Sequence, residues 1–346
     1  IGFPSMKIIV NTLNTVIVIN VAINGCKRPF VTNIPLIIPN NTPNTKNMRL
    51  IYLMHTSDQQ KLVCRMTNEV RYPSWLIEKQ SAFAMFLYKN GIPTAKKFKC
   101  NNNYCIQWKK EKLNLFITLE TYAGKDLENV NLSTFRKFGE LLGRIHAISQ
   151  IYPYRIGFSF TIDAIRKERA KYKNLLTHVN NDYLCRKEIH KAARLHDALI
   201  HILNAVWPYL PQGVVHGDLG IFNNVLVSRD IFTIIDFHLS CDEAYLFDLM
   251  ASFYSSFYKF CRKTNFDYTN SPLLLRLFLN GYTKYRKLTR FEEQNFEAIS
   301  SLMNGIFCTK YIIEKCNRSL SSDDAEHFNY IANIFIQGIN CYESHC

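Results

Sequence analysis

The chain begins with a stretch, residues 1–28, that is rich in β-branched residues and asparagine but has no clear hydrophobic period. Short apolar runs follow at residues 30–38, 48–54 and 61–66, separated by turn-forming residues such as Asn, Pro, Thr and Ser. Apolar runs of this length between turn signals are typical of β-strands. We therefore expect a poorly specified N-terminal arm over residues 1–28, followed by three strands.

The pattern then changes to a helical spacing. Residues 73–90 carry apolar side chains three and four positions apart, as in an amphipathic helix, and Gly91 ends the segment. Residues 113–127 begin as a further strand and run into an irregular connector at residues 122–125. The connector is the expected domain boundary, so residues 29–121 form the predicted N-terminal lobe.

Beyond the connector the sequence becomes mainly helical. Residues 135–148 and 189–202 each carry an apolar stripe with helical spacing. Two short hydrophobic strands interrupt this pattern between residues 214 and 237, and helices resume from Leu246. Residues 122–346 are therefore predicted to form a larger, mainly α C-terminal lobe.

Composition supports a folded protein of two lobes. The 346 residues exceed one minimal core, and 47% apolar with 20% charged residues argues against disorder. The net charge of +14 favours an anionic partner, such as a nucleotide, nucleic acid or an acidic membrane surface. The basic residues are scattered in short runs that we interpret as solvated faces, so we expect neither nucleic acid nor membrane as a partner. The oligomeric state is not indicated.

The eleven cysteines do not form a metal-binding pattern. Cys100 and Cys105 are the only close pair before the far C-terminus, and no second pair with zinc-type spacing accompanies them. Several others lie in apolar runs, where a reduced thiol behaves as a small hydrophobe. The apolar N-terminal stretch is interrupted by asparagines and no run reaches the roughly 18 residues of a membrane span. We therefore expect a cytoplasmic protein.

Residues 214–237, VVHGDLGIFNNVLVSRDIFTIIDF, carry the strongest chemical signal. They place Asp218, Asn223 and Asp236 on loops at the ends of short strands. Phosphoryl transfer needs a carboxylate beside the attacking hydroxyl and oxygen ligands for Mg²⁺ on the phosphates. These residue types therefore fit the transfer of a phosphoryl group.

The same segment resembles the aminoglycoside phosphotransferase and choline kinase-like superfamily, which is related to the protein kinases. The shared pattern is His-x-Asp, an Asn five residues after the Asp, and a strand that ends in Ile-Asp-Phe. His216, Asp218, Asn223 and Asp236 match it. Asn224 competes with Asn223, because it too directly precedes a strand, but the count from Asp218 favours Asn223.

The resemblance implies an α+β, bilobal protein-kinase-like fold, with a small antiparallel sheet in the N-lobe and a larger, mainly α C-lobe. It also implies ATP and Mg²⁺ as cofactors and a small-molecule hydroxyl as acceptor. Asp218 would orient or deprotonate that hydroxyl, and Asn223 and Asp236 would bind the metal. His216 and Asp248 would brace the catalytic loop.

The N-terminal lobe matches the superfamily less well. Asn47 lies where relatives have an Asn before the second strand, but the preceding loop lacks glycine. Arg65 stands where many relatives have a phosphate-binding Lys, and an Arg fork is not equivalent to a compact ammonium. The resemblance gives Arg65 a partner on the following helix, either Glu78 or Gln80, and we favour Glu78.

Two further positions match the family without a unique interpretation. Glu120 and Tyr122 correspond to the hinge that meets adenine mainly through backbone groups, although Tyr122 packing alone explains the sequence equally well. His146 matches a His of a family helix and is interpreted as structural.

Within the superfamily the chain resembles the homoserine kinase branch. The branch has LP-x-G-V, matched by LPQGV at residues 210–214, a Cys matched by Cys241, and Tyr-Asp-Leu, matched by Phe-Asp-Leu at residues 247–249. L-homoserine is therefore the expected acceptor, with Asp242 and Glu243 as candidates to face its ammonium group. The alternatives are a kinase of choline, ethanolamine, methylthioribose or an aminoglycoside, a catalytically impaired scaffold, and a nucleic-acid-binding module.

Overall fold

The computed structural model consists of two compact units, which are described separately. The first unit comprises residues 1–125 and 226–238, and the second comprises residues 126–225 and 239–346. The sequence pattern did not indicate that residues 226–238 return to the first unit. The structure describes residues 7–11, 16–20, 32–34, 49–55, 60–68, 73–110, 113–159, 190, 194, 197–198, 200–201, 204–228 and 231–316.

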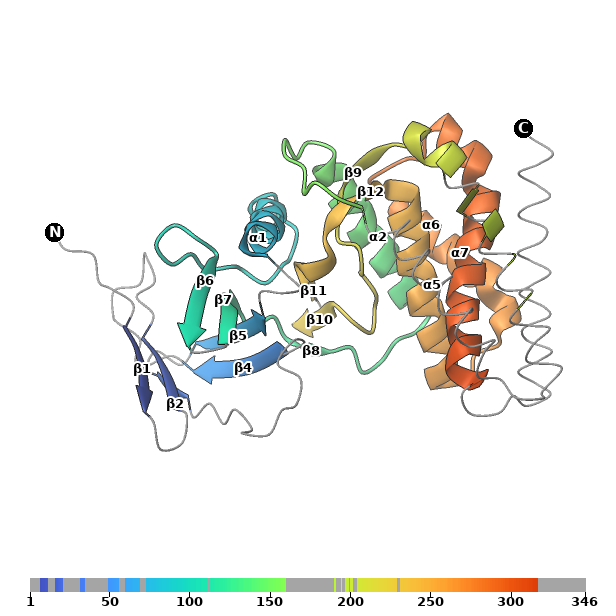
Figure 1. Ribbon diagram of the computed structural model, residues 1–346. Helices are drawn as coiled ribbons and strands as arrows, with labels where there is room; N and C mark the ends of the chain where they lie inside the picture. The colour runs from blue at the N-terminus through green and yellow to red at the C-terminus, as the bar shows by residue number, and fades with distance from the viewer. Residues whose placement is uncertain are drawn as a thin grey trace. The chain divides into compact units, whose positions relative to one another are not determined.

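A four-stranded antiparallel sheet forms the centre of the first unit, with strand order β4-β5-β7-β6 (Figure 1). The strands are β4 (Arg49–His55), β5 (Lys61–Asn68), β6 (Cys105–Lys110) and β7 (Leu113–Thr121). Helix α1 (Ser74–Lys89) follows β5, as its helical spacing predicts. Strand β6 was not predicted.

Strand β5 shows why the sheet places charge on one face. Leu62, Cys64 and Met66 alternate along it and are at most 3% exposed, so they form the core face. Arg65 therefore points to the opposite face. Arg65 is paired with Thr118, and Glu120 is two residues further along β7, so the register puts Arg65 and Glu120 diagonally on the same face.

The N-terminal arm has regular backbone where no period was apparent. Strands β1 (Lys7–Asn11), β2 (Val16–Asn20) and β3 (Thr32–Ile34) pair antiparallel in that order. Repeated β-branched residues favour such pairing even without strict alternation.

Two strands from later in the sequence complete the first unit. Strand β10 (Val225–Ser228) lies between β11 (Ile231–Ile234) and the short β8 (Lys125–Asp126). Ile234 accepts a hydrogen bond from the Ala95 amide and donates its own to Pro93. These bonds fix the end of β11, and therefore the position of the residues that follow it.

The second unit is mainly helical. Its described helices are α2 (Leu132–Ser149), α5 (Tyr245–Thr264), α6 (Ser271–Tyr282) and α7 (Arg290–Cys316), and α5 and α7 lie side by side (Figure 1). Short 3-10 turns occur at Trp207–Tyr209, Phe237–Leu239 and Tyr268–Asn270. Most of the helix predicted over residues 189–202 lies outside the described residues.

Glycines allow α2 and α6 to approach closely. A Cβ atom on Gly139 would lie 1.9 Å from the carbonyl oxygen of Phe278, and one on Gly281 would lie 2.1 Å from that of Arg136. Asn131 caps the start of α2 through a reciprocal pair of hydrogen bonds with Thr134. The backbone contact fixes α2 against α6, and both helices contribute to the site.

Two short antiparallel strands, which were not predicted, lie beside the loop that contains Asp218. Strand β9 (Gln212–Val215) pairs antiparallel with β12 (Cys241–Ala244).

The expected α+β class with a sheet-containing N-lobe and a mainly α C-lobe is confirmed. Among the helices that the structure describes, none is long and apolar enough to cross a membrane.

Candidate active site

The loop between β9 and β10 carries Asp218 and is held by its own residues. Gly217 has φ +81°, and a Cβ atom there would lie 2.2 Å from the carbonyl oxygen of Leu239, so only glycine fits. The Asn224 Nδ2 atom donates to the backbone carbonyl of Asp218 at 2.6 Å and lies 3.3 Å from the Oδ2 atom of the Asp218 carboxylate. The Ile221 amide donates to the Ser256 hydroxyl at 3.1 Å. The half-buried Asp218 carboxylate is therefore fixed in place.

The two neighbouring asparagines have different partners. Asn223 and Asn224 both donate their amides to the Gly220 carbonyl, so the chain makes a helical turn here. Successive side chains on such a turn point roughly 100° apart, and only one of them faces Asp218. That residue is Asn224, whereas the Asn223 Oδ1 atom accepts from the Lys259 ammonium group. The motif count from Asp218 favoured Asn223, whereas the side chain that contacts Asp218 is that of Asn224.

His216 and Asp248, the residues that the resemblance expects to brace the Asp218 loop, are both buried. His216 is fully buried, and Asp248 is 3% exposed at the start of α5. The Asp248 Oδ1 atom accepts from the Gly217 amide at 3.1 Å. Asp248 thus holds the residue directly before Asp218.

A chain of buried polar groups extends from Asp248 through the second unit. His146 Nε2 lies 3.0 Å from Asp248 Oδ2, and His146 Nδ1 lies 2.9 Å from the Tyr282 hydroxyl. Arg286 donates to that hydroxyl at 2.9 Å and to both carboxylate oxygens of Glu292, at 2.8 and 3.0 Å. We call these five residues the buried relay. It links the C-terminal helices to the Asp218 loop.

The donors in the buried relay fix the protonation of its histidine. Arg286 can only donate, so the Tyr282 oxygen accepts its hydrogen bond. The Tyr282 hydroxyl then donates its own hydrogen bond to His146 Nδ1. His146 then carries its proton on Nε2 and donates to Asp248. Burial lowers the pKa of His146, which favours the neutral ring. The predicted structural role of His146 is therefore that of a neutral connector.

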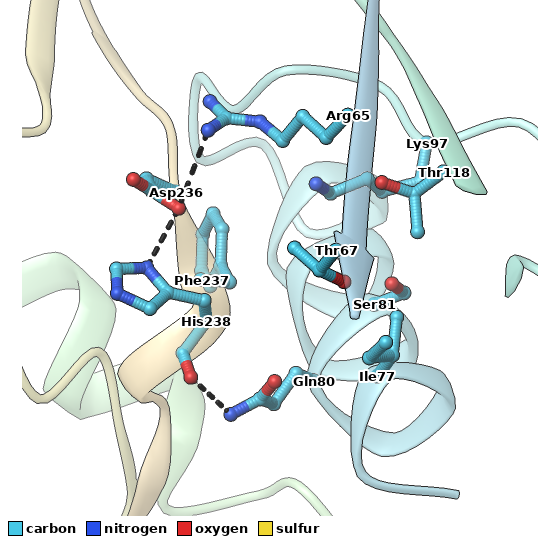
Figure 2. A pocket seen from close by; sticks show the side chains of 10 residues that line it. All are labelled: Arg65, Thr67, Ile77, Gln80, Ser81, Lys97, Thr118, Asp236, Phe237 and His238. Atoms are coloured by element: carbon cyan, nitrogen blue, oxygen red, sulfur yellow. Dashed lines mark hydrogen bonds and ion pairs between the residues drawn. The ribbon is translucent and has the colours of Figure 1, made fainter. Parts of the chain in front are cut away.

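In the first unit, Arg65 lies between the carboxylates of Glu120 and Asp236, and Figure 2 shows its contact with Asp236. Its Nε atom lies 2.7 Å from Glu120 Oε1, and its Nη1 atom lies 3.5 Å from Asp236 Oδ1. Lys97 pairs with the other oxygen of Glu120, and His238 Nδ1 lies 2.7 Å from Asp236 Oδ1. We call these residues, Arg65, Lys97, Glu120, Asp236 and His238, the charged cluster.

The electrostatics of the charged cluster follow from burial and pairing. Burial raises the pKa of Glu120, but the charges of Lys97 and Arg65 outweigh it, so the pKa is lowered overall. Burial likewise opposes the charge of Arg65, yet Glu120 and Asp236 raise its pKa overall. Asp236 has φ +66°, an unusual backbone conformation for a non-glycine residue. All members of the charged cluster except Glu120 also line a cavity of about 60 Å³ between β5 and α1.

The expected partner of Arg65 on helix α1 needs correction. The expected pairing of Arg65 with Glu78 is wrong, because the Glu78 carboxylate accepts from the amides of Tyr104 and Cys105 at 3.1 and 2.6 Å. The alternative, Gln80, lines the cavity and donates to the His238 carbonyl at 2.7 Å (Figure 2).

The expected hinge residues are engaged within the sheet. The Glu120 side chain is 2% exposed and serves the charged cluster. The Tyr122 amide donates to the Lys61 carbonyl at 3.0 Å, while its ring is 38% exposed. Asn47 lies outside the described residues.

Sequence reasoning missed Lys97, His238 and Lys259. Lys97 belongs to a short basic run that was interpreted as a solvated face, but it is 9% exposed. Nothing in the sequence of that run, residues 96–99, distinguishes Lys97 from its basic neighbours. His238 and Lys259 gave no signal, because their roles depend on how Asp236 and Asn223 are turned.

Asp242 and Glu243 do not face a ligand as expected. Asp242 accepts from the amides of Ile156 and Gly157 at 3.1 and 2.7 Å. Glu243 is 3% exposed and accepts from the Trp207 indole and, at 2.7 Å, from the Ser159 hydroxyl. Both carboxylates hold residues 156–159 in place, and Glu243 also holds Trp207.

The sheet-bearing unit, the helical unit and the braced Asp218 loop together define a phosphotransferase with a protein-kinase-like fold. Residues 49–289, more than half of the chain, match the phosphotransferase enzyme family. The chain belongs to this family.

Solved structures show the same fold. An amicoumacin kinase in complex with AMP-PNP, Ca²⁺ and its ligand aligns with a TM-score of 0.62 at 16% identity, covering 84% of this chain and 86% of the other. A microcompartment-associated aminopropanol kinase aligns with a TM-score of 0.57 at 15% identity, covering 86% and 93%.

Curated relatives match over shorter segments. A homoserine kinase of Rhodopseudomonas palustris (strain BisB18) is 29% identical over 167 residues, 47% of this chain and 46% of the relative. A homoserine kinase of Bradyrhizobium diazoefficiens is 32% identical over 96 residues, 28% of each chain. The chain spans less than half the length of these relatives.

Tyr282→Phe should weaken the Asp218 loop, because the variant leaves Arg286 Nη1 and His146 Nδ1 without the hydroxyl that they bond. We expect the free energy of unfolding to fall by about 1–3 kcal/mol and the Gly217 amide to exchange faster. Denaturant unfolding and amide hydrogen exchange measure the two effects.

The control is Tyr254→Phe, which removes a buried hydroxyl bonded to Ser300 at 2.8 Å. It should cost comparable stability and leave Gly217 exchange unchanged once global unfolding is accounted for. Equal exchange at Gly217 in both variants would show that the buried relay does not hold the loop.

Proposed function

We propose that this protein is an ATP- and Mg²⁺-dependent kinase that phosphorylates a hydroxyl group of a small molecule. The observation that carries the proposal is the half-buried Asp218, fixed by Asn224 on one side and by Asp248 through Gly217 on the other. Family membership and the kinase-like fold support it.

In this proposal Asp218 orients the acceptor hydroxyl and accepts its proton as the phosphoryl group is transferred. Most of the acceleration in phosphoryl transfer comes from positioning and charge neutralisation. A carboxylate that is fixed by Asn224 and, through Gly217, by Asp248 loses little freedom on binding and keeps the hydroxyl in line. The buried relay therefore serves the reaction by holding Asp218 rather than by moving protons.

The donor chemistry fits Mg²⁺. Asp236 supplies a carboxylate, and Asn224, whose Nδ2 faces Asp218, has its amide oxygen as the atom that suits a cation. Mg²⁺ is usually held by one or two carboxylates, with phosphates and water completing its shell. No group of three or more His, Cys, Asp or Glu suited to a metal occurs in the part of the chain that the structure describes. The bound metal would neutralise charge on the phosphates.

Arg65 and Lys97 are the residues that we assign to the nucleotide phosphates. Both are largely buried cations that already balance Glu120, and Arg65 also reaches Asp236. The cavity that they line is much smaller than the roughly 300 Å³ of a site for a whole ligand. It is therefore not the adenine site, and the proposed hinge contacts of Glu120 and Tyr122 would involve their backbone carbonyls, since the Tyr122 amide is engaged.

L-homoserine is the acceptor that we propose. The matched relatives are homoserine kinases, and LPQGV, Cys241 and Asp248 match that branch in sequence. Cys241 is buried and, with residues 212–215, forms the strand pair that frames the Asp218 loop. These residues support the loop, so their match bears on the acceptor only indirectly.

Asn224→Ala should weaken Mg²⁺-dependent ATP binding by about 10–100-fold, the range for disturbing a metal shell, whereas Asn223→Ala should change it by less than about threefold. Calorimetric titration of ATP with and without Mg²⁺ measures both, and the two variants control for each other. A larger loss in Asn223→Ala would return the metal role to Asn223.

Wild-type protein supplied with Mg-ATP should phosphorylate L-homoserine with a kcat/KM at least about tenfold above that of choline, ethanolamine, methylthioribose or an aminoglycoside, because a polar site rejects analogues that leave its charges unpaired. ATP consumption and the phosphorylated product are measured for each acceptor. Choline turnover at or above the homoserine value would contradict the acceptor and leave the kinase proposal intact.

A further inference from the structure

Helix α5 carries a group of cations beside the Asp218 loop. Lys259 donates to Asn223 Oδ1, and the Lys263 ammonium lies 4.6 Å from the centre of the Phe222 ring. Lys259, Arg262 and Lys263 are three and four positions apart, so they lie on one face of the helix. The last turns of α5 therefore present positive charge to the residues that follow Asp218.

Lys259 is the innermost cation of this group. It is half-buried, whereas Arg262 and Lys263 are exposed. Burial lowers the pKa of Lys259, Asp218 acts to raise it, and Arg262 and Lys263 lower it further. Lys259 is thus a desolvated ammonium whose hydrogen-bond partner, the Asn223 amide, is neutral.

This arrangement leaves an excess of positive charge next to the proposed catalytic carboxylate. An ammonium group has three donors, so Lys259 can keep Asn223 and still bind a second acceptor. A partly desolvated cation gains most from an anionic partner, because a charge-assisted hydrogen bond is about twice as strong as a neutral one. The local field would attract an anionic ligand and repel a cationic one.

We propose that Lys259 binds the carboxylate of the acceptor while Asp218 faces its hydroxyl, so that the acceptor class is a hydroxy acid or hydroxy amino acid. The inference rests on the proposed function, which assigns Asp218 to the acceptor. Lys259 would be the basic partner of the acceptor carboxylate, which the sequence did not identify.

The transferred phosphoryl group is the other anion that an ammonium group near Asp218 can bind. Arg65 and Lys97 already provide cations for the phosphates in the first unit, whereas Lys259 belongs with Asp218 in the second. We therefore assign Lys259 to the acceptor carboxylate rather than to the phosphoryl group. The two assignments predict different effects of a Lys259 variant on KM and kcat.

The test compares L-homoserine with 3-aminopropan-1-ol, which is the same molecule without its carboxylate. Lys259→Met should raise the KM and the calorimetric Kd for L-homoserine by about 10–100-fold, the loss of one charge-assisted hydrogen bond. Both constants for 3-aminopropan-1-ol should stay within about threefold, and Lys259→Arg should recover part of the loss. The matched control is Lys137→Met, an exposed lysine on α2.

Each outcome decides the role of Lys259. An equal fall in kcat with both acceptors and no change in KM would assign Lys259 to the phosphoryl group and overturn the inference, as would unchanged constants for L-homoserine. If wild-type protein turns over neither acceptor, the proposed function fails, and calorimetry still decides the inference. L-homoserine binding to the wild type that weakens in Lys259→Met would support it, and equal or absent binding would overturn it.

Discussion

The position of the Asp218 loop depends on one buried carboxylate, Asp248, which accepts hydrogen bonds from the Gly217 amide and the His146 ring at once. A carboxylate at 3% exposure is costly unless its oxygens are satisfied, and here both are. Tyr282 and Arg286 extend the hydrogen bonds from His146 to helix α7, so the order of the loop is coupled to the packing of helices far along the chain. Removing any member leaves buried polar groups unpaired, which makes the arrangement nearly all-or-none.

Charge is handled differently in the two units. In the first unit, Arg65 and Lys97 are matched by Glu120 and Asp236, so their charge is balanced within the unit. In the second unit, Lys259 bonds a neutral amide, and Asp218 is one carboxylate beside the three cations Lys259, Arg262 and Lys263. A balanced cluster preserves its geometry, whereas an unbalanced group attracts a ligand of opposite charge.

Sequence alone predicted what is encoded locally and missed what depends on three-dimensional direction. The strands β4, β5 and β7, helix α1 and the Asp218 loop follow from hydrophobic period and motif spacing. The pairing of Arg65 with Glu120 depends on strand register, and the choice between Asn223 and Asn224 depends on a turn that rotates their side chains. Strands β6, β9 and β12 are short or polar, so their hydrogen-bonding partners rather than their sequence patterns define them.

The central claim, that Asp218 acts on the acceptor of a phosphoryl transfer, is tested most directly by Asp218→Asn. The substitution keeps the size and the hydrogen-bonding backbone but removes the base. Mg-ATP affinity should remain within about threefold, because Asp218 faces the acceptor, and turnover should fall by roughly 10²–10⁴, the range for losing a general base. Turnover close to the wild-type rate, measured as phosphorylated acceptor, would contradict the account.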